Sequence, residues 1–191
     1  MGLMPGTSPL ADVDQPIDML MDCHRRVEWF LLMLNRVANE APEPLDDEFH
    51  KALTVALDYF DGAAPLHTAD EEDGLFPLLQ LHADQPAVAE VLTVIEQLES
   101  EHETAQPWHD DIDRIGRQWL ESRSVSAGDR AVFTERAADL VRLYSGHIRT
   151  EDTVVFPVAR AVLSPKELQE LGAAMRERRG GFCRERKATQ N

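Results

Sequence analysis

The sequence contains little cysteine. Its 191 residues include only two, Cys23 and Cys183, and these lie far apart in the chain. Metal-binding thiolates usually occur as closely spaced pairs, so a zinc–thiolate cluster is excluded. We therefore interpret Cys23 as a small buried side chain.

Positive charge and long apolar segments are also scarce. Lysine and arginine total 19 against 35 acidic residues, and the formal charge of −16 argues against binding to a nucleic-acid backbone. No apolar run approaches the roughly 20 residues that span a bilayer, and residues 1–9 lack the basic start and apolar core of a signal peptide. We expect a cytoplasmic protein that binds neither nucleic acid nor membranes.

The sequence has no alternating apolar–polar pattern of useful length, whereas a helical period recurs four times. Four long amphipathic segments joined by short loops predict an all-α fold, an up-down-up-down four-helix bundle with a short extra C-terminal helix. We expect a flexible segment at residues 1–13, the bundle at residues 14–163, and a short helix with a basic tail at residues 164–191. A capping box at Ser164 and Glu167 predicts the start of that short helix, and Gly180-Gly181 predicts its end.

The most informative pattern is a repeated motif. His67-Thr-Ala-Asp-Glu71 and His147-Ile-Arg-Thr-Glu151 are each followed, after four more residues, by Phe-Pro. Residues four apart on a helix share a face, with Cβ atoms about 5–6 Å apart, so each copy directs an imidazole and a carboxylate to one place. This combination is a ligand set for iron, manganese or zinc.

The second copy of the motif lies within an apolar stripe that runs from Phe133 to Val162 in steps of three and four. His147 and Glu151 belong to this stripe, which faces a packed interior. Burying an unpaired carboxylate there costs several kcal/mol unless it is neutralised or binds a cation. The alternative is a kinked helix with a hydrogen-bonded core histidine, and the repetition of the whole motif argues against it.

Two further histidines, His24 and His102, also fall in apolar stripes. His24 precedes the first motif by 43 residues and His102 precedes the second by 45, so a lone histidine followed by a motif occurs twice. Two helical hairpins related by a pseudo-twofold axis would bring four imidazoles and two carboxylates together. Six such ligands suit two ions, with both carboxylates bridging. The predicted metal ligands are His24, His67, Glu71, His102, His147 and Glu151.

These residues resemble the hemerythrin-like, His-His-Glu cation-binding family. The match consists of His24, His67-x-x-x-Glu71 with Leu-Phe-Pro77, His102, and His147-x-x-x-Glu151 with Phe-Pro157, and it covers residues 14 to 163. The resemblance implies a four-helix bundle that holds two iron ions in a non-haem centre with an oxo or hydroxo bridge. Members of the family bind oxygen, sense oxygen or iron, handle nitric oxide, or decompose peroxide.

The sequence departs from the oxygen-carrying members at one position. Those proteins have a His-x-x-x-His on the third helix, but here the residue four after His102 is Gln106. They also have a differently spaced Asp in place of Glu151. We therefore favour redox chemistry on hydrogen peroxide over reversible dioxygen carriage. The alternatives are a non-catalytic sensor or store that binds dioxygen, nitric oxide or iron, and a helical interaction module with a structural zinc.

Several residues near the motifs are weaker candidates. Tyr59 precedes His67 by two turns and Tyr144 precedes His147 by one, so either phenol could replace the missing imidazole, although we favour core packing for both. His109 shares a face with His102 but lies two turns away, which also fits an ordinary core histidine. Asp70, Glu72 and Glu28 are candidates for hydrogen bonds to the ligands. The basic tail from Arg176 onwards either docks on the bundle or on another subunit, or is solvated.

Overall fold

The computed structural model describes the backbone of residues 15–189 and the side chains of residues 15–180, and every regular element in this part of the chain is a helix. The predicted all-α fold is thereby confirmed for these residues. The flexible segment expected at residues 1–13 lies outside them. In order, the elements are α1 (Pro16–Glu40), α2 (Asp47–Asp70), η1 (Glu71–Leu75), α3 (Phe76–Gln80), α4 (Pro86–Ser122), α5 (Ala127–Thr150), η2 (Glu151–Val155), α6 (Phe156–Val162) and α7 (Pro165–Thr189).

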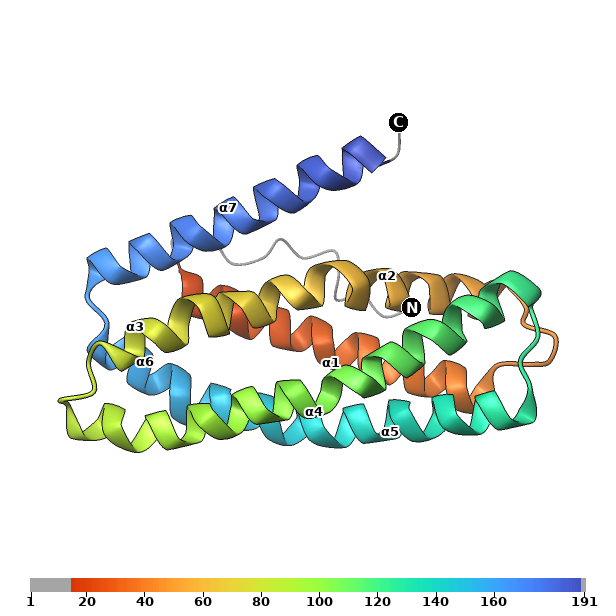
Figure 1. Ribbon diagram of the computed structural model, residues 1–191, viewed down its shortest axis with the longest axis horizontal. Helices are drawn as coiled ribbons and strands as arrows, with labels where there is room; N and C mark the ends of the chain where they lie inside the picture. Colours follow the sequence, from red (N-terminus) through yellow and green to blue (C-terminus); the bar gives the residue numbers. More distant parts are fainter. Residues whose placement is uncertain (1–14, 190–191) are drawn as a thin grey trace.

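Four helical rods lie side by side along the long axis of the molecule (Figure 1). The first rod is α1, the second is α2 continued by η1 and α3, the third is α4, and the fourth is α5 continued by η2 and α6. Helix α1 packs against α2 and α5, and α4 packs against the same two helices. The rods therefore enclose a common interior. Helix α7 lies outside them and contacts α1, α2 and η1.

Local sequence signals explain where the rods begin. Asp46 accepts a hydrogen bond from the backbone N–H of Phe49 at the start of α2, and Ser126 does the same for Asp129 at the start of α5. Helices α1 and α4 begin instead with a proline, whose missing N–H would have no partner in the first turn of a helix.

The interior contains two apolar clusters with a polar layer between them. One cluster includes Val27, Ala105 and Ile148, and the other includes Leu20, Leu98 and Val155. On each of the four helical rods, a residue of the predicted metal site lies in sequence between members of the two clusters. The order Leu20, His24, Val27 on α1 is one example. The apolar clusters hold the helices in register and so fix the polar layer.

Helix α7 is longer than the sequence predicted. The capping box forms as expected, because the backbone N–H of Ser164 donates to the Glu167 carboxylate at 2.8 Å. However, the helix extends over 25 residues and does not end at Gly180-Gly181. Glycine costs about 1 kcal/mol relative to alanine inside a helix, so it weakens a helix without necessarily ending it. The buried side chains Leu171 and Met175 anchor the part of α7 before the glycines.

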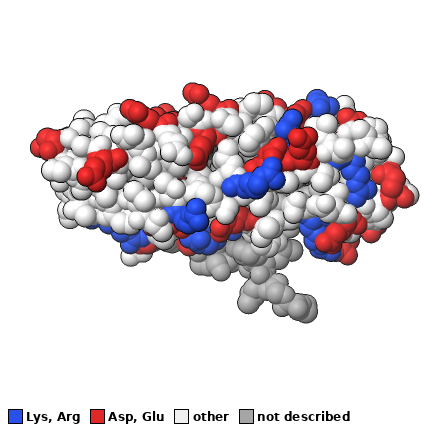
Figure 2. All heavy atoms as spheres, turned by 90° about the horizontal axis from the view of Figure 1, so that it is seen from below, with Lys and Arg blue, Asp and Glu red and all other residues white. Residues whose placement is uncertain are grey.

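Acidic and basic side chains are interspersed on the face of the molecule that Figure 2 presents. Several of them form ion pairs on the surface, such as Arg117 with Asp58 at 2.9 Å. Among the described residues, no helix combines the length and the apolar character that crossing a membrane requires.

Candidate metal centre

The fold brings all six predicted ligand residues into the polar layer. Glu71 is fully buried and touches three histidines. Its Oε1 lies 3.3 Å from Nε2 of His67 and 3.6 Å from Nε2 of His24, and its Oε2 lies 3.9 Å from Nε2 of His102. Glu71 therefore contacts histidines from both halves of the chain.

Glu151, also fully buried, makes a second link between the halves. Its Oε2 lies 3.1 Å from Nε2 of His24 and 3.4 Å from Nε2 of His147. Two overlapping sets of ligand atoms, each within 4.8 Å of one another, are present in the described part of the chain: His24, His67 and Glu71, and Glu71, His102 and His147. The two sets share Glu71, and Glu151 contacts one histidine of each set. The duplication inferred from the sequence thus corresponds to two overlapping sets of potential ligand atoms.

Each of these glutamates begins a π-helical turn. The backbone N–H of Phe76 bonds to the carbonyl of Glu71, five residues back, and Phe156 bonds to Glu151 in the same way. The next residue in each copy is a proline, which has no N–H and would clash with the carbonyl four residues back in a regular α-helix. A wider turn relieves that clash, and such turns are frequent at functional sites. The Phe-Pro pair of each motif was therefore the sequence signal for these two turns.

The chemistry of the cluster fits a bound cation. None of the four carboxylate oxygens of Glu71 and Glu151 makes a hydrogen bond of normal geometry, although all four are buried. Leaving such groups without partners is costly, and a cation between them would remove that cost. Imidazole and carboxylate together form a ligand set for iron, manganese or zinc.

Protons can also neutralise part of the charge in this cluster, because the pKa values of Glu71 and His24 lie above their usual values. Burial raises the pKa of Glu71 to about 8, and the negative charge of Glu151 adds to this rise. Burial also acts to raise the pKa of Glu151, but the close imidazoles of His147 and His24 outweigh it and hold that pKa well below its usual value. The pKa of His24 behaves in the opposite way: burial acts to lower it, but the hydrogen bond to Asp152 and the nearby Glu151 carboxylate raise it well above its usual value. Metal uptake must therefore displace protons from this cluster.

Three of the four histidines are oriented by a second carboxylate. Nδ1 of His24 lies 2.8 Å from Asp152, and Nδ1 of His102 lies 2.7 Å from Glu72. Nδ1 of His147 lies 3.0 Å from Glu101. Such contacts fix the ring orientation and tautomer, so that Nε2 points toward the carboxylates of the cluster.

The sequence identified only one of these three orienting acids. Glu72 was a candidate, but Asp152 and Glu101 were missed, although Asp152 follows Glu151 as Glu72 follows Glu71. The candidate Glu28 was wrong, because it forms an exposed ion pair with Arg25 at 3.4 Å. Each orienting acid that follows a motif glutamate binds the lone histidine of the other half of the chain. That exchange is consistent with the pseudo-twofold relationship.

The remaining candidates do not belong to either set of ligand atoms. The ring of Tyr59 stacks on Phe30 with centroids 4.1 Å apart, as expected of a core aromatic. The hydroxyl of Tyr144 lies 3.2 Å from Nε2 of His109, and its ring lies 5.6 Å from the ring of His147. Asp70 instead pairs with two arginines of α7. The basic tail therefore contacts its own bundle through its described arginines.

Comparison with known proteins agrees with the geometry of this site. The sequence profile of the hemerythrin HHE cation-binding domain matches residues 15–159. An uncharacterized protein of Haemophilus influenzae is 30% identical over 171 residues, which cover 87% of this chain and 91% of that protein. The matched region contains all six residues of the cluster. The chain belongs to the hemerythrin HHE cation-binding family.

Proposed function

We propose that this chain is a cytoplasmic di-iron protein, an up-down-up-down four-helix bundle, that decomposes hydrogen peroxide. His24 and His67 would hold one ion, and His102 and His147 the other. Glu71 and Glu151 lie between the two pairs and would bridge the ions. A ligand set of imidazole and carboxylate without thiolate suits iron.

The observation that best supports this reaction is the position of Gln106. Oxygen-carrying relatives have a histidine there, but this glutamine is exposed and donates a hydrogen bond to Asp110 at 2.8 Å. It therefore does not contribute a ligand to the centre. Two imidazoles, an oxygen from each carboxylate and a bridging oxygen make about five donors for each ion, against a preference for six. Each ion would keep one position for a small molecule.

When bound, an iron pair supplies a two-electron redox couple. In the overall reaction, one hydrogen peroxide is reduced to two waters while a second is oxidised to dioxygen, so no outside electron donor is needed. The chain supplies the rest of the chemistry. Apolar clusters on both sides of the polar layer exclude bulk water, and Asp152, Glu72 and Glu101 keep three imidazoles in their binding orientation.

The decisive test is oxygen evolution from hydrogen peroxide by the iron-loaded protein. Metal analysis should find about two iron ions per chain, as the number of ligands requires. A Glu151→Ala variant should lose the activity, whereas Glu28→Ala, which removes an exposed carboxylate of the adjacent helix, should retain it. If the wild type evolves no more oxygen than Glu151→Ala or free iron, the catalytic proposal is wrong. A non-catalytic role in binding dioxygen, nitric oxide or iron would then replace it. One zinc and no iron in protein from iron-replete cells would also exclude the di-iron centre.

A further inference from the structure

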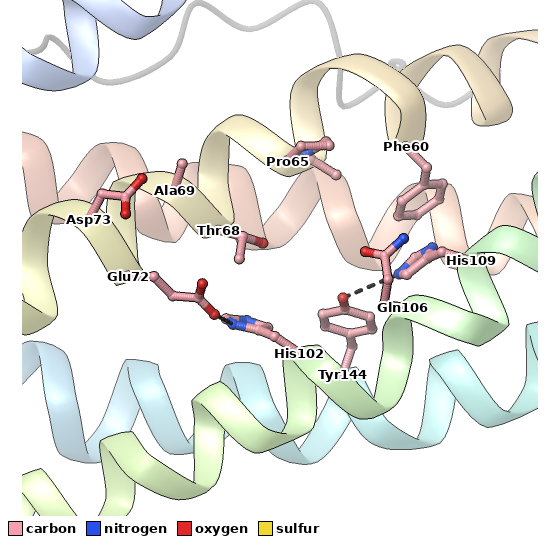
Figure 3. A pocket seen from close by; sticks show the side chains of 11 residues that line it. Phe60, Pro65, Thr68, Ala69, Glu72, Asp73, His102, Gln106, His109 and Tyr144 are labelled. Carbon is pink, nitrogen blue, oxygen red and sulfur yellow. Dashed lines mark hydrogen bonds and ion pairs between the residues drawn. The ribbon is translucent and has the colours of Figure 1, made fainter.

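A pocket of about 300 Å³ opens between α2 and α4, directly beside the metal centre (Figure 3). Glu72 and His102 lie at one end of it, and Phe60, Gln106, His109 and Tyr144 gather at the other. Because Glu72 and His102 of the candidate metal centre line it, the pocket is placed to deliver a small molecule to that centre.

A much smaller chamber of about 20 Å³ continues this pocket inwards. Three of the four histidines, His67, His102 and His147, form part of its wall, and Val27 and Ile148 supply apolar surface. The chamber and the outer pocket share five lining residues, so they form one path from the surface to the cluster: Phe60, Ala64, Thr68, His102 and Tyr144.

The size of the chamber restricts what can occupy it. A cavity needs about 10–15 Å³ of such space to hold one water. A chamber of about 20 Å³ therefore holds a molecule slightly larger than water, such as hydrogen peroxide, dioxygen or nitric oxide. An alkyl hydroperoxide is too bulky for it.

The five residues that line both the pocket and the chamber form what we call the neck of the path, and neighbouring side chains pack around it. The ring of Phe60 lies 5.1 Å from the ring of His109 and 5.3 Å from the ring of Tyr59. The Tyr144 hydroxyl lies 3.2 Å from Nε2 of His109, and its ring lies 5.6 Å from that of His147. These contacts pack Phe60 and Tyr144 against neighbouring rings at the neck.

Charge at the mouth favours an uncharged molecule. Glu72 and Asp73 line the outer pocket. An adjoining groove of about 390 Å³ between the same helices adds three aspartates and one arginine, namely Asp61, Asp110, Asp113 and Arg114. This excess of carboxylates repels anionic oxidants and leaves neutral hydrogen peroxide unaffected.

We propose that the pocket between α2 and α4 is the entrance to the metal centre, and that Phe60, Ala64 and Tyr144 restrict it to uncharged molecules of about two heavy atoms. The substrate class that follows is hydrogen peroxide itself, not organic hydroperoxides. This choice of substrate rests on the proposed function, whereas the route applies to any small ligand of the centre.

The route can be tested without catalysis, by the association rate of nitric oxide with the anaerobic ferrous protein in a stopped-flow spectrometer. Ala64→Leu places a larger side chain in the neck and should slow association about tenfold, because a packed site accommodates added volume poorly. Phe60→Ala should speed association. Each variant is compared at equal iron content and helical circular dichroism.

Two control variants distinguish the route from general effects on the fold. Phe49→Ala removes the same ring from the same helix, away from the path, and should leave the association rate unchanged. Leu32→Trp fills a separate groove of about 290 Å³ between α1 and α5 that also reaches Tyr144. If Leu32→Trp slows association and Ala64→Leu does not, the entrance lies between α1 and α5 and the inference is wrong. Equal rates in the wild type, Ala64→Leu and Phe60→Ala overturn it as well.

Substrate selection is tested by comparing hydrogen peroxide with tert-butyl hydroperoxide as oxidants of the ferrous protein. The wild type should react with hydrogen peroxide and not with the alkyl compound, and Phe60→Ala should react with both. Rapid reaction of the wild type with tert-butyl hydroperoxide would contradict the size limit. If the variants change nitric oxide association but no oxygen is evolved from peroxide, the entrance stands and only the catalytic proposal fails.

Discussion

Asp70 and Arg179 form an ion pair, with Oδ2 of the aspartate 2.6 Å from Nη1 of the arginine. Asp70 is fully buried and directly precedes Glu71 of the metal centre. Arg178 contacts the other oxygen of the same carboxylate at 2.8 Å. Arg179 also lies 3.9 Å from Sγ of Cys23, the residue before His24. Helix α7 thus attaches directly beside two of the residues that we expect to bind metal.

Removing both arginines should destabilise the protein strongly. In an Arg178→Gln, Arg179→Gln double variant, Asp70 keeps a buried charge without a partner, which costs about 3–5 kcal/mol. Urea unfolding of the metal-free protein would measure this loss. Adding Asp70→Asn to the double variant removes the charge and should recover part of the stability. Lys166→Gln, at the exposed start of α7, is the control and should unfold like the wild type. A double variant as stable as this control would show that the ion pairs contribute little.

Replacing Asp152 by asparagine should weaken metal binding without removing a ligand. The Asp152 carboxylate orients His24 through a 2.8 Å contact with Nδ1. Loss of such an orienting group typically lowers metal affinity about 10- to 100-fold. Competition with a chelator of known affinity measures the change, and Glu28→Gln serves as a matched control on a carboxylate of the neighbouring helix. Equal affinities of Asp152→Asn and Glu28→Gln would mean that this contact does not hold the histidine in place.

Metal uptake at neutral pH should release at least two protons per chain, because metal ligands must be deprotonated and His147, whose pKa is also raised by Glu151, can add to the release. One comes from Glu71, whose pKa burial raises to about 8. Another comes from His24, whose pKa lies well above its usual value. A pH-indicator dye in weakly buffered solution would measure the release during titration with cobalt(II), which stays in one oxidation state. Above the pKa of Glu71, the release should fall by about one proton. An unchanged proton release across that pKa would exclude Glu71 as the buried acid.

His109 should make the protein sensitive to mild acid. The unfolded chain protonates this histidine near pH 6.5, whereas burial lowers its pKa to about 4 in the folded protein. Its contribution is therefore fully present above pH 6.5 and is lost as pH falls toward 4, at a total cost of about 3–4 kcal/mol. Urea unfolding of wild type and His109→Gln across this range isolates the effect, and the variant should show the flatter profile. Parallel profiles would mean that the pKa of His109 is the same in the folded and the unfolded chain.

The sequence by itself determined the helices and the six residues that come together in the candidate metal centre. Their signals are local: a period of 3.6 residues placed His24 and His102 in apolar stripes, and the four-residue spacing placed His67 beside Glu71. The Phe-Pro pairs likewise explain the two π-helical turns. A proline lacks the N–H and clashes with the carbonyl four residues back in any α-helix, whatever that helix packs against.

Only the tertiary structure decided which side chains meet across the bundle. Asp152 orients His24 from 128 residues away, whereas Glu28, one turn from His24 on the same helix, faces solvent beside Arg25. The length of α7 was decided in the same way, because Asp70 and the apolar core hold it against the bundle despite its glycines. Such contacts depend on the rotation and axial shift of each helix against its neighbours. Those are set by the packing of the whole core, not by the periodicity of any one segment.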